Sequence, residues 1–507
     1  MKRKGLCLLL TAIMVMGIAA CGPKDDEWGG AKGGINVVID EAGFGSAWLD
    51  NAAAAYSKKT GIKVNVDKNY IQGETISLLN DGTLPYDIAF PMGNILGAQN
   101  TNRLVDLTPL YERTPEGSEI PVKEMLTPSL YEKMLTEDGK IFQVPWTESY
   151  MSIIYNKSSL DKAFPDGYTL PRTTQELLDF CEKIKKETQL YPFSFCPSIP
   201  YSYCAHLVWW AQYEGFDDYY DYFYGYYRDA NGERKLALNG EVMDMPGRKK
   251  SLEELQKLIA RNNGNMHANA DSMTYTDMQV AFLGQGYKGR DMKECAFAFN
   301  GNWLENEMKK YLAVKPQDFR MMKMPVISCI TEKLEDKQMS ETKLREVISA
   351  IDNGETDYQK LGVSEDDFAR IREARRMVNG QTMYSYPACV PKTSKNQDKA
   401  MDFLEFLVSA EGQKIYAEST NGLTMPFGYQ PDAETVSSFV QSGYDLFGRD
   451  YLTIEADGFS PLVYNQGFSY YVGLVDSKLY SGSSPDSILK TTKDYYMTYW
   501  DQIIALA

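Results

Sequence analysis

Apolar residues in the first ninety positions alternate between short continuous runs and helical spacing. A nearly continuous apolar run at 35–40 is followed by a glycine-containing loop, and residues 48–56 then carry apolar side chains every three or four positions. The first pattern is typical of a buried strand and the second of an amphipathic helix. A strand at 62–66, a helix at 70–79 and a strand at 86–90 repeat the unit. This alternation predicts an α/β fold with a parallel sheet covered on both faces.

Later segments continue the alternation less regularly. The pattern predicts an amphipathic helix at 177–186, a hairpin at 226–236 with an Asn-Gly turn, a buried strand at 295–299 and a helix at 400–407. Residues 331–377 are rich in charged side chains at helical spacing. This composition predicts a solvated helical insertion.

The N-terminus has the organisation of an export signal. Three Lys and Arg residues precede an apolar run at 6–18, which is followed by Ala19-Ala20-Cys21. The motif resembles the lipobox of bacterial lipoproteins, which implies a signal peptide at 1–20 and a diacylglycerol group on Cys21. An ordinary secretory signal with an incidental cysteine is the alternative. The glycine-rich, charged composition of 21–34 predicts a flexible tether, so we expect an extracytoplasmic protein lipid-anchored to the cell membrane.

Charge and cysteine content exclude several classes of protein. The chain has 53 Lys and Arg against 69 Asp and Glu, a net charge of −16, which argues against nucleic acid as a partner. Neither His206 nor His267 has metal-ligand spacing, and no Cys-x-x-Cys occurs, so we expect no metal and no cofactor. Disulfides and free thiols both remain open for the six cysteines expected in the folded part: Cys181, Cys196, Cys204, Cys295, Cys329 and Cys389.

Several segments together resemble the family 1 extracellular solute-binding proteins, the maltodextrin-binding kind that serve ABC importers. The strongest likeness lies in Tyr155-Asn156-Lys157 and in the stretch 390–412. The other segments that carry it are 55–64, 85–88, 139–145 and 299–303. The resemblance covers most of the mature chain and implies a bilobal periplasmic-binding-protein-like fold of type II. In that fold, two α/β lobes are joined by a hinge and close over a ligand in the cleft between them.

The resemblance also implies how the chain is divided between the lobes. Residues 35–150 and 387–429 would form the N-terminal lobe. Residues 151–325 and 430–507 would form the C-terminal lobe, and 326–386 would be the charged helical insertion.

A sugar site needs aromatic rings for the apolar faces of the sugar and polar groups for its hydroxyls. Ligands of open α/β sheets lie beyond the carboxyl ends of strands, which favours residues in the loops that follow them. Trp303 is the preferred candidate, because it follows the strand at 295–299 in the loop that supplies the stacking tryptophan of the family. Glu148 falls where the family carries a sugar-binding carboxylate, whereas Pro91, Asn94 and Ile95 depart from the family pattern. The full set of candidates is Glu41, Phe44, Asn94, Trp146, Glu148, Asn300, Trp303 and Tyr470.

We therefore expect a monomeric binding protein that delivers a mono- or oligosaccharide to the permease subunits of an ABC transporter, and not an enzyme. The same fold holding a peptide, polyamine or anion is the first alternative, and a surface-anchored glycoside hydrolase is the second. No Gly-x-Ser-x-Gly motif supports a hydrolase, and the Gly-x-Gly-x-x-Gly at 284–289 follows a helical pattern instead of a strand. The aromatic cluster at 219–227 fits an extended sugar platform or, more simply, a helix packed into a hairpin.

Overall fold

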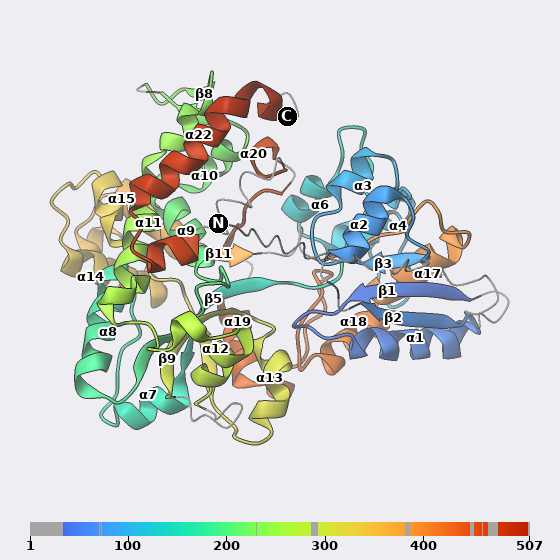
Figure 1. The fold of residues 1–507 in the computed structure, drawn as a ribbon, viewed down its shortest axis with the longest axis horizontal. Coiled ribbons are helices and arrows are strands. Elements are labelled where there is room, and N and C mark those ends of the chain that lie inside the picture. The colour runs from blue at the N-terminus through green and yellow to red at the C-terminus, as the bar shows by residue number, and fades with distance from the viewer. Residues whose placement is uncertain are drawn as a thin grey trace, which may run out of the picture.

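The computed structural model shows two α/β bodies beside one another, joined by extended segments (Figure 1). We call the body built on β1, β2 and β3 the N-terminal lobe and the body that contains β5 and β9 the C-terminal lobe. Cys21 and Tyr470 lie outside the described part of the chain. The structure describes residues 34–69, 71, 73–229, 231–284, 293–380, 386–446, 451–458, 460–464 and 475–504.

The N-terminal lobe contains the predicted parallel sheet. β1 (Ile35–Asp40) lies between β2 (Val64–Asn69) and β3 (Ile88–Phe90), and both neighbours are parallel to it. β1 is almost wholly buried, which explains its continuous apolar sequence. α1 (Ala47–Thr60) ends at Gly61, whose positive φ of 77° suits glycine.

Residues from the last quarter of the chain return to the N-terminal lobe. β12 (Pro387–Ala388) pairs with β4 (Val144–Pro145), and the backbone of Cys389 pairs with that of Ala89 in β3 in an isolated antiparallel β-bridge. α17 (Gln397–Val408) and α18 (Ala410–Ser419) pack against α1. The other helices of this lobe are α2 (Glu74–Asp81), α3 (Leu96–Asn100), α4 (Thr108–Tyr111), α5 (Val122–Met125) and α6 (Pro128–Met134).

The C-terminal lobe is built on a mixed sheet of six strands. Five follow the order β13, β11, β5, β9, β6, and β10 pairs with β5 beside this path. Both β5 and β9 are buried along their whole length, so they form the centre of the lobe. The bounds are β5 (Tyr150–Asn156), β6 (Tyr191–Ser194), β9 (Cys295–Gly301), β10 (Phe319–Met322), β11 (Met377–Gly380) and β13 (Leu452–Ile454).

Among the helices of this lobe, α9 (Tyr203–Glu214) is central. Ten of its twelve residues are buried, which is expected of a helix that is apolar all round. It packs against α11 and β11. The remaining helices are α7 (Lys157–Ala163), α8 (Thr174–Glu187), α10 (Phe216–Phe223), α11 (Pro246–Ile259), α12 (Tyr275–Phe282), α13 (Leu304–Leu312), α14 (Glu341–Asp352), α15 (Glu365–Arg376), α19 (Ser438–Leu446), α20 (Pro461–Tyr464) and α22 (Pro485–Ile504). The short 3-10 turns are η1 (Gly240–Asp244), η2 (Arg261–Asn263), η3 (Ala270–Ser272), η4 (Ser328–Lys333), η5 (Gln359–Leu361) and η6 (Ala433–Thr435).

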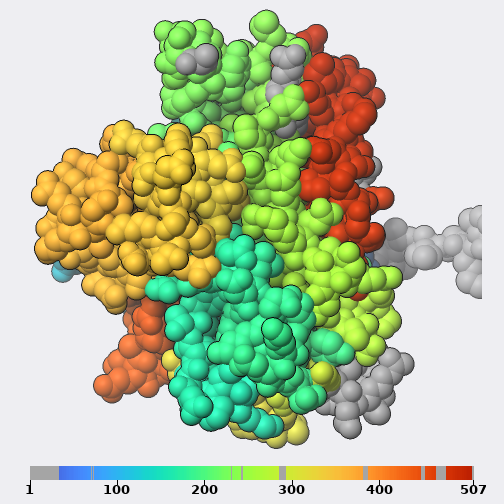
Figure 2. All heavy atoms as spheres, turned by 90° about the vertical axis from the view of Figure 1, so that its left-hand side faces the viewer, coloured from blue at the N-terminus to red at the C-terminus, as the bar shows by residue number. Residues whose placement is uncertain are grey.

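The charged segment expected as a helical insertion contributes to two parts of the lobe. α14 and α15 lie in the gold projection on the outer face in Figure 2. β11, which follows α15 directly, lies inside the six-stranded sheet between β5 and β13. The segment therefore combines a solvated helical pair with a strand of the lobe's main sheet.

Two smaller points of the sequence analysis concern the hairpin and the cysteines. The hairpin is present as β7 (Tyr226–Arg228) and β8 (Arg234–Leu236), and the rings of Tyr219, Tyr222 and Phe223 beside it are buried in the core. All six cysteines of the described residues are free thiols. Within the described ranges, no helix combines the length and the apolar character needed to cross a membrane.

Candidate functional site

The two lobes meet where the loop after β1 reaches the start of α13. A methyl group placed on Gly43 would stand 2.4 Å from Cδ1 of Trp303, so glycine backbone lies directly against the indole. Asn306 Nδ2 donates a hydrogen bond of 2.9 Å to the carbonyl oxygen of Gly43. The ring of Phe44 meets Trp303 edge-on at 5.6 Å between centroids. We use the term interlobe site for the residues around this contact: Gly43, Phe44, Tyr201, Tyr203, Trp303, Glu307, Tyr386, Glu455 and Asp476.

An aromatic cluster fills the centre of the interlobe site. Phe44 lies 4.9 Å from Tyr386 and 5.9 Å from Trp146, both edge-on. Trp303 is only 4 % exposed, and Phe44 and Trp146 are buried as well. Trp146 stacks on Trp48 at 5.1 Å, which places it in the core of the N-terminal lobe beneath Phe44. The structure therefore brings three predicted residues together: Phe44, Trp146 and Trp303.

The predicted polar residues of the N-terminal lobe differ in their surroundings. Glu41 is exposed and accepts a hydrogen bond of 2.9 Å from the Ser46 hydroxyl. Asn94 reaches the other lobe, where its Nδ2 donates to the carbonyl oxygen of Gly458 at 2.9 Å. Asn94 therefore takes part in the contact between the lobes, whereas Glu41 supports the loop that carries Phe44.

Asn300 lies in β9 of the C-terminal lobe, and Glu148 lies in the segment that runs from β4 to β5. Asn300 Oδ1 accepts from the Gly301 amide, and its buried Nδ2 has no partner among the described residues. The Glu148 amide donates to the Thr424 carbonyl at 2.8 Å, and the Thr424 hydroxyl donates to the Glu148 carboxylate. Asn302 Nδ2 also donates to the Glu148 carbonyl at 2.9 Å. Burial raises the pKa of Glu148. These contacts tie Glu148 to the segment at Thr424 and to Asn302 at the end of β9.

Tyrosines and carboxyl groups of the C-terminal lobe complete the interlobe site, and the sequence analysis did not select them. Tyr201 lies 6.2 Å from Trp303 between ring centroids. Tyr201 and Tyr203 follow β6 at the start of α9, so the rule that ligands lie beyond strand ends applied to them too. Glu307 lies one helical turn after Trp303, on the same face of α13. Glu455 and Asp476 carry no local motif.

Burial changes the acidity of these carboxyl groups. It raises the pKa of Glu307 to about 8, and the pKa of Glu455 and of Asp476 each to about 7. The ammonium of Lys133, on α6 of the other lobe, lowers the pKa of Glu455 in part, and Ser202 lowers that of Asp476 through its side chain and then its amide. The site is therefore acidic and poorly compensated by cations.

Lys133 forms a further contact between the lobes. Its ammonium lies 4.0 Å from a carboxylate oxygen of Glu455 and 4.4 Å from the centre of the Tyr220 ring. Together with the bond from Asn94 to Gly458, this contact joins the N-terminal lobe to the segment that follows β13.

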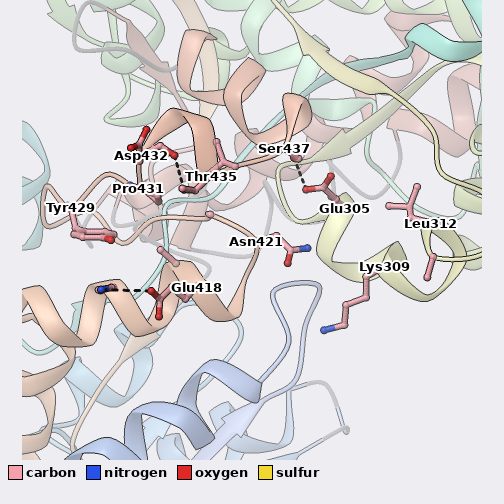
Figure 3. A pocket seen from close by; sticks show the side chains of 15 residues that line it. Glu305, Lys309, Leu312, Glu418, Asn421, Tyr429, Pro431, Asp432, Thr435 and Ser437 are labelled. Carbon is pink, nitrogen blue, oxygen red and sulfur yellow. Dashed lines mark hydrogen bonds and ion pairs between the residues drawn. The ribbon is translucent and has the colours of Figure 1, made fainter.

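A hollow of about 770 Å³ lies on the opposite face of α13, between that helix and α18. Figure 3 shows Glu305 and Lys309 of α13 facing Glu418 and Asn421 across it. Glu305 accepts a hydrogen bond of 2.7 Å from Ser437. Because Glu305 and Lys309 are one turn apart, they lie on the face of α13 away from Trp303 and Glu307. Within the described residues, no group of three or more His, Cys, Asp or Glu is arranged to hold a metal ion.

Comparisons with known proteins agree with this architecture. The structure is similar to one solved in work on xylan utilization by the thermophilic bacterium Caldanaerobius polysaccharolyticus, with a TM-score of 0.61 and 13 % identity over 91 % of this chain and 99 % of that chain. At this identity the likeness concerns the fold alone. No match is found among curated proteins. The profile described as bacterial extracellular solute-binding protein matches residues 39–414, well over half of the chain. The chain therefore belongs to the bacterial extracellular solute-binding proteins, and is an extracytoplasmic binding protein with a small-molecule ligand and ABC permease partners, not an enzyme.

Proposed function

We propose that the protein binds a mono- or oligosaccharide in the interlobe site and delivers it to the permease of an ABC transporter. One observation carries the proposal: an indole, three phenols and three carboxyl groups gather in the interlobe site. Trp303 and the tyrosines offer flat apolar surface for the C–H faces of a sugar, and the carboxyl groups offer acceptors for its hydroxyls. The fold likeness to a protein from work on xylan utilization supports the same class of ligand.

Binding requires the lobes to separate first. Trp303 is 4 % exposed, because Gly43 and Phe44 of the N-terminal lobe cover it. A ligand can reach the indole only after these residues withdraw, and reclosure then buries the ligand. We place the hinge at the boundaries proposed from the sequence, near residues 150, 387 and 429, where the chain passes between the lobes.

Within this proposal the predicted residues take different roles. Trp303 stacks on the sugar, and Phe44 packs against one edge of the bound ligand. Asn300 offers its unpartnered amide to a hydroxyl. Trp146 supports Phe44 from below, and Glu148 keeps the crossing segments together. The remaining three sugar-site candidates are Glu41 and Asn94 at the N-terminal lobe and Tyr470, which lies outside the described residues.

We also propose that Cys21 carries the lipid that holds the protein at the cell membrane. β1 begins at Ile35, so a tether of about a dozen residues separates the anchor from the first strand. A glycine-rich tether of this length spans roughly 20 Å as a random coil, which leaves the lobes free to turn toward a permease.

A polyamine is the second candidate ligand, because buried carboxyl groups beside aromatic rings also suit a cation. The test is a thermal shift screen of the mature chain from Gly22 against xylo- and malto-oligosaccharides, monosaccharides, peptides and spermidine. A selective, concentration-dependent rise in Tm with one sugar, which is recovered intact, supports the proposal. A rise with spermidine or a peptide and none with any sugar contradicts it.

A further inference from the structure

Three carboxyl groups surround the tyrosines of the interlobe site, each from a different segment of the C-terminal lobe. Burial raises the pKa of Tyr201 and of Tyr386, and the charge of Glu307 raises both further. Burial likewise raises the pKa of Tyr203, and the charges of Asp476 and Glu455 add to this effect. The phenols of Tyr203 and Tyr386 also raise the pKa of Tyr201, and the phenol of Tyr386 raises the pKa of Tyr203. Glu307 therefore lies near Tyr201 and Tyr386, and Glu455 and Asp476 lie near Tyr203.

Among the described residues, no donor bonds one oxygen of each of two of these carboxyl groups, Oε2 of Glu455 and Oδ1 of Asp476. Both side chains are buried, because Glu455 is only 8 % exposed and Asp476 is fully buried. The other oxygen of Asp476 accepts from the Ser202 amide at 2.9 Å. Buried acceptors are almost always paired in folded proteins, because an unmet one is costly. Unpaired oxygens beside the tyrosines of the interlobe site indicate that a ligand supplies the donors.

The same carboxyl groups have little opposing charge. Among the described residues, only Glu455 of the three has a cation within 4.0 Å, and that cation is Lys133 on the other lobe. Glu307 accepts from the neutral amide of Gln279. Asp457 lies close enough to Glu455 to raise its pKa. A negatively charged ligand would therefore meet repulsion here with a single lysine to offset it.

We propose that Glu307, Glu455 and Asp476 select the charge of the ligand, so that the site takes neutral or amino sugars and rejects sugars that carry a uronic acid. This inference rests on the proposed sugar-binding function. Sugar hydroxyls and ammonium groups donate to the unpaired carboxyl oxygens, whereas a uronate brings a further acceptor and a like charge. A binding site discriminates well against a close analogue when that analogue leaves buried groups unpaired or brings like charges together.

Calorimetry on the mature, full-length chain tests the proposal with a set of short oligosaccharides. The probes are xylotriose, xylotriose bearing a glucuronic acid branch, maltotriose and a glucosamine trisaccharide. We expect the tightest neutral or amino probe to bind at least tenfold more tightly than the glucuronic acid probe. The titrations are run at pH 8.5, above the pKa of about 7 that burial gives Glu455 and Asp476, so that both carboxyl groups are ionised. In Glu455→Gln and Asp476→Asn this ratio should then shrink several-fold, because each variant removes one repelling charge. The exposed variant Asp494→Asn, on α22, is the control and should keep the wild-type ratio.

Each outcome decides between the two proposals. Equal affinity of wild-type protein for neutral and glucuronic acid probes would overturn the charge selection and leave the sugar-binding function intact. A ratio unchanged in Glu455→Gln, Asp476→Asn and the half-buried Glu307→Gln would also overturn it. Binding of spermidine with no binding of any sugar would overturn both. The comparison among probes uses wild-type protein, so it does not depend on the folding of any variant.

Discussion

Trp303 of the C-terminal lobe lies directly against Gly43 of the N-terminal lobe, and a methyl group on Gly43 would stand 2.4 Å from Cδ1 of the indole. The residue that we propose to stack on the sugar is therefore also the residue that the opposite lobe covers. Ligand and lobe compete for the same ring surface. The affinity for the sugar therefore depends on the free energy needed to move Gly43 away from the indole and on the free energy of stacking between the indole and the sugar.

We expect Gly43→Ala to hold the lobes apart. A Cβ atom at 2.4 Å from a ring carbon forces the indole or the loop to move, and overpacking of this kind costs about 1–3 kcal/mol. The strain falls on the closed form only, so the affinity for the sugar should drop by about fivefold or more. Small-angle scattering should show a larger radius of gyration for the ligand-free variant than for wild type.

Gly301→Ala is the matched control for this variant. Its Cβ would stand 2.1 Å from Cζ3 of the same indole, but Gly301 belongs to the same lobe as Trp303. Both substitutions disturb the ring, and only Gly43→Ala acts between the lobes. Equal radii of gyration in the two variants would show that Gly43 does not control closure.

We expect Trp303→Ala to weaken sugar binding by about 1–3 kcal/mol, because the variant removes the stacking surface. Titration calorimetry measures the loss directly. Trp303→Phe should recover part of it, since a smaller ring still stacks. Tyr499→Ala removes an aromatic side chain on α22 that is 42 % exposed, and should leave the affinity unchanged. If Trp303→Ala binds the sugar as tightly as wild type, the indole does not contact the ligand.

The sequence predicts those parts of the fold whose residues are close together in the chain. The alternation of apolar runs and helical spacing at 35–90 predicts the parallel sheet, because each βα unit buries its own apolar face. Trp303 was identifiable because it directly follows the buried strand β9. β11 could not be predicted in the same way, because its four residues follow the charged helix α15. Its place in the sheet is fixed by β5 and β13, which lie far away in the chain.

The rest of the site depends on contacts that no local pattern records. Asp476 meets the Ser202 amide across 274 residues, and Lys133 meets Glu455 across more than 300. For Trp146 the position in the chain was informative, but it did not indicate the direction in which the ring points. Its stacking on Trp48 follows from the packing of α1 against the lobe core.

We expect Cys21 to carry acyl chains, because the motif at 18–21 resembles a lipobox. Labelled palmitate should enter the wild-type protein in living cells, and the protein should sediment with membranes. Cys21→Ser should lose the label. Cys329→Ser, which removes a free thiol of the folded part, is the control and should keep it. A label retained in Cys21→Ser would place the lipid elsewhere or show a different modification.

The buried carboxyl groups should make the ligand-free protein less stable as the pH rises toward 8. The pKa values of Glu455 and Asp476 are about 7 in the folded protein, against ordinary values of 4.5 and 3.8. Between these limits the unfolded chain is ionised while the folded chain still holds its protons, so stability falls with rising pH. Each pKa unit corresponds to about 1.4 kcal/mol, so the full change reaches a few kcal/mol.

The two histidines act in the opposite direction at lower pH. Burial lowers the pKa of His206 to about 3 and of His267 to about 4, so below their ordinary value of 6.5 the unfolded chain takes up protons that the folded chain does not. These residues make stability rise with pH up to about 6.5 and add nothing above it. The fall due to the carboxyl groups should therefore be clearest between about pH 6.5 and pH 8.

Asp476→Asn separates the carboxyl effect from that of the histidines. The variant keeps an acceptor for the Ser202 amide but has no proton to lose, so its Tm relative to wild type should rise by a few degrees between pH 5 and pH 8. Thermal denaturation by circular dichroism at four or five pH values measures the difference. Asp494→Asn removes an exposed acid paired with Lys490 on α22, and its Tm relative to wild type should stay constant. A constant difference for Asp476→Asn as well would show that Asp476 is already ionised in the folded protein at pH 5, and that burial does not hold its proton.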